Sequence, residues 1–451
     1  MYNSLDYNNQ NIEVIPQSKD KIIAINFENI NDYYRKGYFV FYNDSNELSC
    51  VLVKPSTISY IKRKYNNIIK FYSVTEKDLF SILEQSFSQL ITHKSQHYLS
   101  LVSKDVSAKT VDYKKMITGF LLLFTISLLF FSNLFHFANN AIYLAQNFFK
   151  MLLFKRSIAK NLNPPLPTFK KHEGKIPIYT IFVPLYKEVR KLRSIIRAID
   201  NLDYPKSKLD VKFIIEADDK ETIKALSIID LPRYIHVIKV PFSLPRTKPK
   251  AMNYATAYIK GDYLCIYDAE DKPDSDQLLK ALHAFKQLPE EYACVQARLN
   301  FYNSEENLLT RFFSMEYTLW FEYLLKGLDL YGLPITLGGT SNHFKVSVLK
   351  KIGYWDAYNV TEDADLGIRL YSKGYKVHII DSKTLEEAPI SLGNWLTQRT
   401  RWIKGFIQTI YIFFLSPKNY QVLGFRKVLS IYVFIGFSSY SFFCMPWIMV
   451  A

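Results

Sequence analysis

The chain has 451 residues and a formal net charge of +15 at pH 7. This length exceeds one compact domain and predicts two or three. The basic charge is not accompanied by an arginine-rich run or by zinc-ligand spacing, which excludes the common nucleic-acid-binding modules and leaves anionic lipids or phosphorylated substrates as partners. The four cysteines form no CxxC pair and are typical of buried thiols in a reducing compartment; they are Cys50, Cys265, Cys294 and Cys444.

Residues 1–110 are expected to form a small soluble α+β module. Apolar runs at 38–42 and 50–53 predict strands. The segment from Ser73 to Glu76 resembles a capping box and predicts a helix that runs to about Leu90. No catalytic set of side chains is visible in this region, which favours a binding or regulatory module.

Two apolar runs then predict a membrane hairpin over residues 114–156. The first, 117–134, carries no charge and is close to the roughly 20 residues that span a bilayer. The second, 137–154, is weaker because it contains Asn139, Asn140, Gln146 and Lys150. Basic pairs flank the hairpin, and the turn at 135–136 has neither Lys nor Arg, so both flanks are expected to be cytoplasmic. A third span is predicted at 428–451, and no signal peptide precedes any of them.

A Pro- and Lys-rich linker at 161–176 leads into a domain over residues 177–415. Five strand-like runs follow one another at 179–183, 211–215, 235–240, 263–267 and 294–299. Helical patterns such as 189–199 and 277–285 lie between most of them. This alternation predicts a parallel, doubly wound α/β sheet, whose ligands bind beyond the carboxyl ends of the strands.

Acidic residues end two of these strands. Asp218 and Asp219 follow the second, and Asp268 and Glu270, with Asp271 as a third candidate, follow the fourth. A divalent metal held by one or two carboxylates suits a substrate diphosphate, although acids at strand ends also cap the next helix. The first strand has no Gly-rich turn after it, and the chain has no Walker-type loop, which argues against a dinucleotide cofactor.

Basic and small residues supply further candidates. Lys248 and Lys250 precede a predicted helix, where they either hold a phosphate or form a solvated basic loop. A polar loop at 338–343 contains Gly339, Thr340 and Ser341, which suit close approach to a sugar. His343, at the end of that loop, fits a structural role better than a catalytic one.

Two motifs in the last part of the domain complete the set. Glu362 and Asp363 follow Thr361 at a helix start, where they either favour the helix dipole or supply a general base. Gln398, Arg401 and Trp402 share one helix face at i, i+3 and i+4. An indole stacks on sugar rings and an arginine pairs with phosphate, although an interfacial helix with an aromatic belt has the same pattern.

In order and spacing, these motifs over residues 178–414 resemble the inverting, membrane-bound family 2 glycosyltransferases, the group of cellulose, chitin and hyaluronan synthases. The resemblance implies a GT-A fold on the cytoplasmic face, a UDP-sugar donor and Mg²⁺ or Mn²⁺. It implies that Asp268 and Glu270 hold the metal and that Asp363, beside Glu362, is the base. The remaining roles are nucleotide-sugar binding by Glu188, Asp218 or Asp219, Lys248, Gln398 and Arg401, and acceptor binding by Trp402, Gly339, Thr340 and Ser341.

The runs at 298–303, 338–344 and 359–367 resemble most closely the bacterial XagB-like branch, which carries an N-terminal domain similar to that of type II secretion ATPases. Two features depart from the family pattern: the metal motif is DxE rather than DxD, and one span follows the QxxRW motif instead of several. Either the channel region is truncated, or other subunits or copies are expected to complete a channel.

The expected activity is transfer of glucose or N-acetylglucosamine from a UDP-sugar to a growing β-linked polysaccharide at the bacterial inner membrane. The alternatives are transfer of a single sugar to a lipid carrier, and a truncated, non-catalytic membrane-binding protein.

Overall fold

The computed structural model describes residues 3–5, 28–42, 47–65, 68, 70–103, 106–130, 132–159, 176–415 and 417–440. Most of the predicted linker, the end of the third predicted span and Cys444 lie outside these residues. The other three cysteines are buried free thiols, as predicted.

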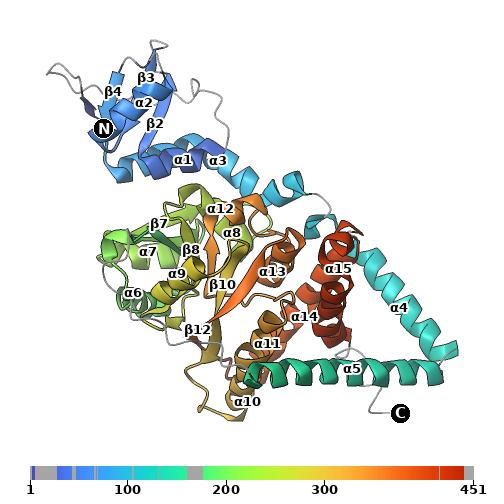
Figure 1. The fold of residues 1–451 in the computed structure, drawn as a ribbon. Helices are drawn as coiled ribbons and strands as arrows, with labels where there is room; N and C mark the ends of the chain where they lie inside the picture. Colours follow the sequence, from blue (N-terminus) through green and yellow to red (C-terminus); the bar gives the residue numbers. More distant parts are fainter. Residues whose placement is uncertain are drawn as a thin grey trace.

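The amino-terminal part forms a small α+β unit (Figure 1). Its four-stranded sheet has the order β1-β4-β3-β2. The strand predicted at 38–42 is present as β2, and the one predicted at 50–53 is β3, which begins two residues earlier. The elements are β1 (Asn3–Leu5), α1 (Glu28–Lys36), β2 (Tyr38–Tyr42), β3 (Leu48–Leu52), α2 (Ile58–Lys64) and β4 (Lys70–Ser73).

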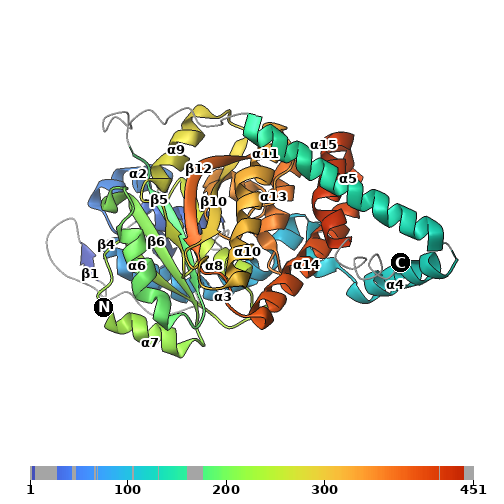
Figure 2. The same cartoon turned by 90° about the horizontal axis from the view of Figure 1, so that it is seen from below.

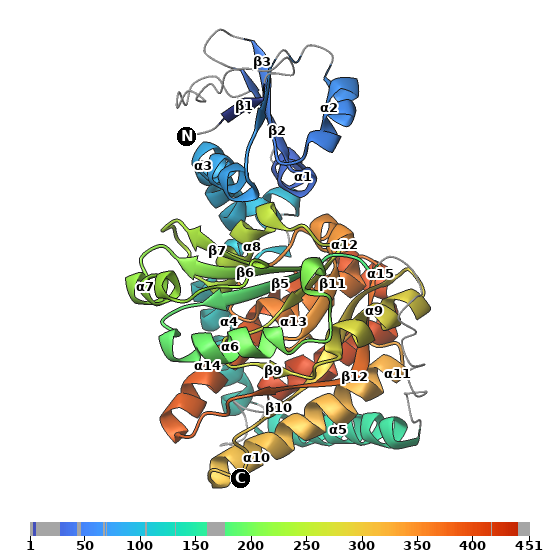
Figure 3. The same cartoon turned by 90° about the vertical axis from the view of Figure 1, so that its left-hand side faces the viewer.

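A long helix, α3 (Glu76–Val102), joins this unit to the rest of the molecule. Its capping box is formed by Thr75 and Asp78, because the Asp78 amide donates to the Thr75 hydroxyl at 3.2 Å and the Thr75 amide donates to the Asp78 carboxylate at 3.1 Å. The predicted end at Leu90 is wrong. The buried face repeats about every fourth residue past that point, and its second half packs on the large domain (Figure 3); the buried residues are Leu79, Leu83, Phe87, Ile91, Ser95 and Leu99.

The large domain is built on an eight-stranded sheet with the order β7-β6-β5-β8-β11-β10-β12-β9. Strands β7, β6, β5 and β8 are parallel, as predicted. The prediction of an all-parallel sheet is wrong at β11, which runs antiparallel between β8 and β10. Residues 342–345 are polar enough to resemble a loop, yet they form a buried strand in the sheet. The strands are β5 (Tyr179–Leu185), β6 (Leu209–Glu216), β7 (Ile235–Val240), β8 (Tyr263–Ile266), β9 (Lys272–Pro273), β10 (Tyr292–Phe301), β11 (Asn342–Lys345) and β12 (Lys376–Glu386).

Helices cover both faces of this sheet (Figure 2). Alternate side chains of β5 enter two cores, since Ile181 and Val183 pack with α6, α7 and α9, whereas Phe182 packs with α3, α8 and α13. The core that holds Phe182 continues into the amino-terminal unit, so both parts share one apolar interior. The helices of this domain are α6 (Leu192–Asp200), α7 (Lys220–Ile228), α8 (Lys248–Ala255), α9 (Gln277–Gln287), α10 (Leu308–Tyr317), α11 (Leu325–Leu330), α12 (Val346–Lys351), α13 (Glu362–Ser372) and α14 (Leu392–Phe414), with a π-helical turn at Thr318–Leu324 between α10 and α11.

Three helices extend along one side of the domain: α4 (Tyr113–Phe130), α5 (Ser132–Ala159) and α15 (Pro417–Ile431), which continues through a π-helical turn, Tyr432–Gly436. Among the described residues, one helix, Tyr420–Tyr440, is long and apolar enough to cross a bilayer, and α4 holds a shorter apolar run, Ile117–Ile126. Two of the four polar residues that weaken the second predicted run, Asn139 and Gln146, face this helix. Gln146 donates to Ser438 at 2.5 Å, and Asn139 accepts from Tyr440. Both are buried, which is how polar side chains join neighbouring helices.

Candidate active site

The carboxyl ends of the parallel strands open onto a cleft of about 520 Å³. Beyond the strand ends, its walls come from the start of α8, the start of α13 and the middle of α14. Nine of the predicted site residues line it together: Lys248, Asp268, Glu270, Gly339, Glu362, Asp363, Gln398, Arg401 and Trp402. Segments that lie up to about 150 residues apart in the chain therefore share one cavity, as ligand sites in open α/β sheets do.

Four carboxyl groups gather at the ends of β8 and β12. The Asp268 amide donates to Asp271 Oδ2 at 2.7 Å, and the Thr340 hydroxyl donates to the same carboxylate. Burial and the Asp268 charge raise the pKa of Glu270 to about 7. Burial, with Asp271 and Asp268 next in importance, raises the pKa of Glu386 well above its usual value. These carboxyl groups repel one another, and the cluster is short of positive charge.

This cluster suits a divalent cation. Asp271 Oδ1 is buried and has no hydrogen-bond partner among the described residues. Carboxylate oxygens are the ligands that Mg²⁺ prefers, and Mg²⁺ keeps several waters and takes its remaining ligands from substrate phosphates. Among the described residues, no three acidic, histidine or cysteine side chains are arranged in metal-binding geometry, and Asp268 is paired with Lys248.

Lys248 is the cation at the centre of the cleft. Its ammonium donates to Asp268 Oδ1 at 2.5 Å and to the Gly339 carbonyl at 3.0 Å. Burial opposes its charge, but Asp268, Glu362 and Asp363 together raise the pKa of Lys248, so it stays protonated. Lys250 points the other way and is buried against Glu216 at 2.9 Å, so only Lys248 is placed to meet a phosphate.

Glu362 and Asp363 form the first turn of α13 on the opposite wall. Burial and the Asp363 charge raise the pKa of Glu362 well above its usual value, and burial raises the pKa of Asp363 although Lys248 opposes it. Gly339 faces this pair, and a Cβ built there would lie 3.3 Å from Asp363 Oδ2. Thr361 occupies the N-cap position but makes no side-chain capping bond, so a cap does not explain its presence.

The segment before Glu362 is attached to α14. The Asn359 side-chain amide donates to Thr409 Oγ1 at 3.0 Å, and the Val360 amide donates to Gln408 at 3.2 Å. Asn359 in turn accepts from the Thr361 amide at 3.0 Å. The carboxylates at the start of α13 are thus positioned by the same helix that carries Gln398, Arg401 and Trp402.

Arg399, the second residue of the QxxRW motif, organises this helix. Its guanidinium pairs with both carboxylate oxygens of Glu316 and lies 4.8 Å from the Trp402 ring and 4.7 Å from the Phe313 ring. Arg401 is exposed and makes no ion pair with a described residue, and it lines the cleft. The two arginines of the motif therefore have different roles. Arg399 orients the Trp402 indole, and Arg401 remains available to a ligand.

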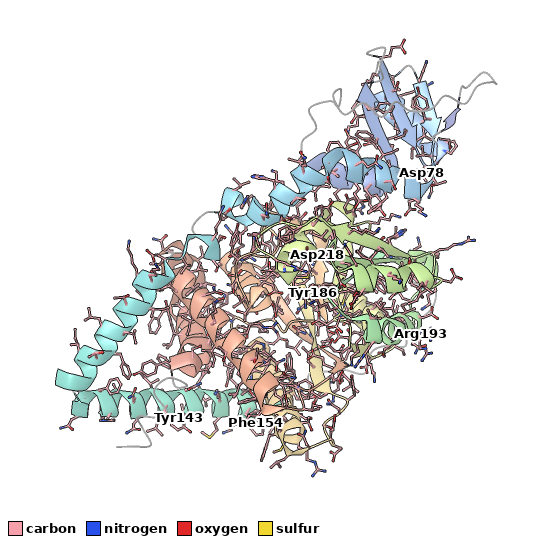
Figure 4. The ribbon with its side chains drawn as sticks, turned by 180° about the vertical axis from the view of Figure 1, so that it is seen from behind. Asp78, Tyr143, Phe154, Tyr186, Arg193 and Asp218 are labelled. Atoms are coloured by element: carbon pink, nitrogen blue, oxygen red, sulfur yellow. The ribbon has the colours of Figure 1, made fainter. Side chains whose placement is uncertain are left out.

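The acids after β6 have separate roles. Asp219 caps α7, accepting from the Thr222 amide at 3.1 Å and the Lys187 amide at 2.6 Å, and it is buried. Asp218 is exposed and paired with Arg246 at 2.8 Å (Figure 4). The Arg246 guanidinium lies 4.6 Å above the ring of Tyr186, which is labelled beside Asp218 in the same view. Of the two candidate acids, Asp218 is the one that can reach a ligand.

Other predicted residues lie outside the cleft. Thr340 and Ser341 are buried, and the Ser341 hydroxyl donates to Thr384 at 2.6 Å, so direct contact with an acceptor does not fit their positions. Glu188 follows β5 at the same edge, where burial raises its pKa and Asp268 adds to the effect. His343 is structural, as expected; it is buried in β11 at 2.8 Å from the Tyr179 hydroxyl, and burial lowers its pKa to about 3.

Three residues of the site were missed: Glu386, Arg246 and Arg399. Glu386 ends β12, so the rule that selected Asp268 would have found it had that strand been recognised. Arg246 precedes Lys248 in one basic loop. No sequence signal separates Arg399 from Arg401, because the difference lies in Glu316, 83 residues away.

Comparisons with known proteins give matches to part of the chain. Residues 263–451 match the family described as glycosyl transferase family group 2. A probable glycosyltransferase, YdaM of Bacillus subtilis (strain 168), is 28% identical over 247 residues, which are 53% of this chain and 58% of that protein. The matching segment thus spans little more than half of the relative.

Two solved structures are also similar. A mannosyltransferase from Pyrobaculum calidifontis, solved with GDP-Man and Mn²⁺, has a TM-score of 0.46 and 18% identity, covering 69% of this chain and 87% of that one. Residues 1–349 of S. aureus TarS with UDP-GlcNAc have a TM-score of 0.36 and 12% identity, covering 56% and 72%.

Proposed function

Because residues 263–451 carry a domain of glycosyl transferase family group 2, we propose that the chain moves a sugar from a UDP-sugar to an acceptor hydroxyl with inversion at the anomeric carbon. The observation that carries this proposal is that one cleft is lined by a partly buried carboxylate, Asp363, and by a protonated lysine, Lys248, beside the acidic cluster. Asp363 can accept a proton, while Lys248 can bind a diphosphate.

In the proposed reaction the acceptor hydroxyl gives its proton to Asp363. Its oxygen forms a bond to the anomeric carbon from the face opposite the diphosphate, and the bond from that carbon to the diphosphate oxygen breaks with its electron pair. UDP leaves, and the configuration inverts to a β-linkage. The raised pKa of Asp363, caused first by burial, makes this carboxylate a better base than an exposed aspartate.

The donor would extend along the edge of the sheet. The nucleoside end fits Tyr186, Asp218 and Arg246, where an aromatic ring and an exposed carboxylate lie together. The diphosphate fits Lys248, with Arg401 as a further cation in the lining of the cleft. Mg²⁺ or Mn²⁺ held by Asp268 and Glu270, with Asp271 behind them, would neutralise charge on the departing diphosphate.

The acceptor would enter along α14. Trp402 offers an indole face beside Gln398, whose Oε1 is buried without a described hydrogen-bond partner and can accept a bond from a sugar hydroxyl. The acceptor is proposed to be a growing β-linked glycan; a lipid-linked single sugar is the alternative, and product size separates the two.

Membrane attachment through α4, α5 and helix Tyr420–Tyr440 is part of the proposal. The hairpin exposes large apolar side chains over both helices, among them Leu122 at 59%, Phe137 at 72% and Leu144 at 67% (Figure 4, where Tyr143 and Phe154 mark α5). Soluble surfaces rarely expose so many large apolar side chains on neighbouring helices. With the basic flanks on the cytoplasmic side, the cleft would face the cytoplasm of a bacterial inner membrane.

The test is UDP release by membranes containing the full chain, over a panel of UDP-sugars. Asp363→Asn should reduce release by about 10²–10⁴-fold, the usual contribution of a general base. Asp230→Asn, at an exposed position away from the cleft, is the control and should match the parent protein. Equal release from Asp363→Asn and the parent would remove Asp363 from the mechanism, and no release with any donor would overturn the proposed activity.

A further inference from the structure

A second cavity, of about 230 Å³, lies where α11 ends against the kink of α15. It is lined by Tyr331, Gly332 and Leu333 on one side and by residues 423–427 on the other. It shares no lining residue with the catalytic cleft.

Cations from two distant segments meet at this cavity. The Arg156 guanidinium, from the end of α5, lies 5.4 Å from the centre of the Tyr331 ring. The Arg426 guanidinium, from α15, lies 5.9 Å from the same ring and donates to the Tyr331 carbonyl at 3.3 Å. Lys427 adds a third positive charge to the lining.

No carboxylate of the described residues forms an ion pair with Arg156, Arg426 or Lys427. Asp329, the acid nearest to Tyr331 along the chain, is paired with His378 at 2.7 Å, and its side chain is only 7% exposed. Like charges that converge without a partner repel each other, and a bound anion would relieve that repulsion.

Apolar side chains border the charged cavity. Gly424, with φ of +73°, interrupts α15 in a conformation that glycine adopts readily. The neighbouring Phe425 is 80% exposed and Val422 is 58% exposed. A ligand with a phosphate beside a hydrocarbon chain fits this combination, whereas free phosphate would leave the apolar border without a function.

The position along the chain points to the same ligand. Arg156 directly follows the second proposed membrane run, and Arg426 and Lys427 directly precede the third. Basic residues at the cytoplasmic ends of membrane helices lie at the level of the lipid head groups. We propose that this cavity binds the phosphate of an anionic phospholipid, clamping α5 and α15 to the end of α11.

The inference rests on the proposed membrane placement of α5 but not on catalysis, so binding can be measured without a sugar donor. The purified full chain in neutral detergent would be titrated with short-chain phosphatidylglycerol, with short-chain phosphatidylcholine and with inorganic phosphate. Thermal unfolding reports binding, because a ligand of the folded state raises Tm. Only phosphatidylglycerol is expected to raise it.

Two triple variants decide whether the cavity is responsible. Arg156→Gln, Arg426→Gln and Lys427→Gln together should weaken phosphatidylglycerol binding by about a hundredfold, because each cation near an anionic lipid surface contributes about fivefold. Arg193→Gln, Arg197→Gln and Lys224→Gln remove the same charge from exposed positions on α6 and α7 and should bind like the parent.

Arg156→Gln alone, at an exposed helix end, provides a milder variant should the triple change impair folding, with about fivefold weaker binding expected. Parent-like binding by a folded Arg156→Gln or pocket triple variant would overturn the inference. So would an equal effect of phosphatidylcholine, or a full effect of inorganic phosphate, which would identify a free-phosphate site instead.

Discussion

Gly405 lies so close to Thr361 that a Cβ built on it would overlap Thr361 Oγ1 and lie 2.7 Å from Thr361 Cβ. Gly405 is on α14, one turn beyond Arg401, and Thr361 immediately precedes the two carboxylates of α13. The contact therefore connects the helix that carries the QxxRW motif to the proposed catalytic base. Only a glycine permits it, because no side chain fits the gap.

Gly405→Ala should displace Thr361 and with it Glu362 and Asp363. We expect a loss of stability of about 1–3 kcal/mol, as for other overpacked sites, and a fall in UDP release. Gly393→Ala is the matched control on the same helix, since a Cβ built there would have no atom within 4 Å; it should be neutral or stabilising by up to about 1 kcal/mol. Thermal unfolding and UDP release are the measurements, and similar behaviour of the two variants would contradict the proposed coupling.

Arg399→Lys should disturb Trp402 without touching the acidic cluster. A lysine keeps the charge but cannot make the two-oxygen contact with Glu316 and stack between aromatic rings. We expect UDP release to fall by about tenfold or more, because a small displacement of a group that positions the substrate lowers the reaction rate strongly. Lys404→Arg, an exposed position on the same helix, should be silent. Unchanged release by Arg399→Lys would show that Trp402 is held by other contacts.

The raised pKa of Glu270, about 7, predicts a pH dependence of metal activation. A carboxyl group must lose its proton to bind a cation, so the Mn²⁺ concentration for half-maximal UDP release should fall as pH rises from 6 to 8. Glu270→Gln should remove most of this change. A pH-independent requirement in the parent protein would rule out Glu270 as a ligand that titrates in this range.

The raised pKa of Glu270 also predicts how the stability of the metal-free protein changes with pH. The folded state holds the Glu270 proton more tightly than the unfolded chain, so stability should decrease as pH rises from about 4.5 to 7 and then level off. Glu270→Gln should reduce this slope without abolishing it, because burial also raises the pKa of Asp271 and Glu386. Chemical denaturation at pH 5, 6 and 7.5 measures the slope, and an identical slope in both proteins would contradict the assignment.

Asp356 attaches the segment after α3 to the loop that leads to Thr361. It accepts from the Ala108 amide at 2.5 Å and from the Ser107 hydroxyl at 3.2 Å, and it is buried. Asp356→Ala should destabilise the protein by about 1–3 kcal/mol, since buried donors lose their partner. Limited proteolysis should then cut faster near residues 103–112 than in the parent protein, with exposed Asp230→Ala as the control. Equal cleavage rates would show that α3 is held by its packing on α8 alone.

The chemistry of the site was readable from the sequence because it lies where strands end. Asp218, Asp268 and Lys248 each adjoin a β-rich run or a helix start. Parallel strands bring their carboxyl ends to one edge of the sheet, regardless of the conformation of the connecting loops. The sequence also predicted that Gln398, Arg401 and Trp402 lie on one face of the helix over 392–414. Their shared face follows from the i, i+3 and i+4 spacing within a helix and needs no tertiary contact.

What the tertiary structure decided are relationships between segments that no local pattern encodes. β11 is a buried strand because β8 and β10 satisfy its backbone hydrogen bonds, not because its own residues favour a strand. Asp219 is a helix cap, and Asp218 is an exposed carboxylate paired with Arg246, because of contacts that form only in the folded chain. The sequence by itself determined which polar side chains are candidates for chemistry and on which local element most of them stand. Only packing decided their neighbours, burial and charge environment, because those depend on residues brought together from distant parts of the chain.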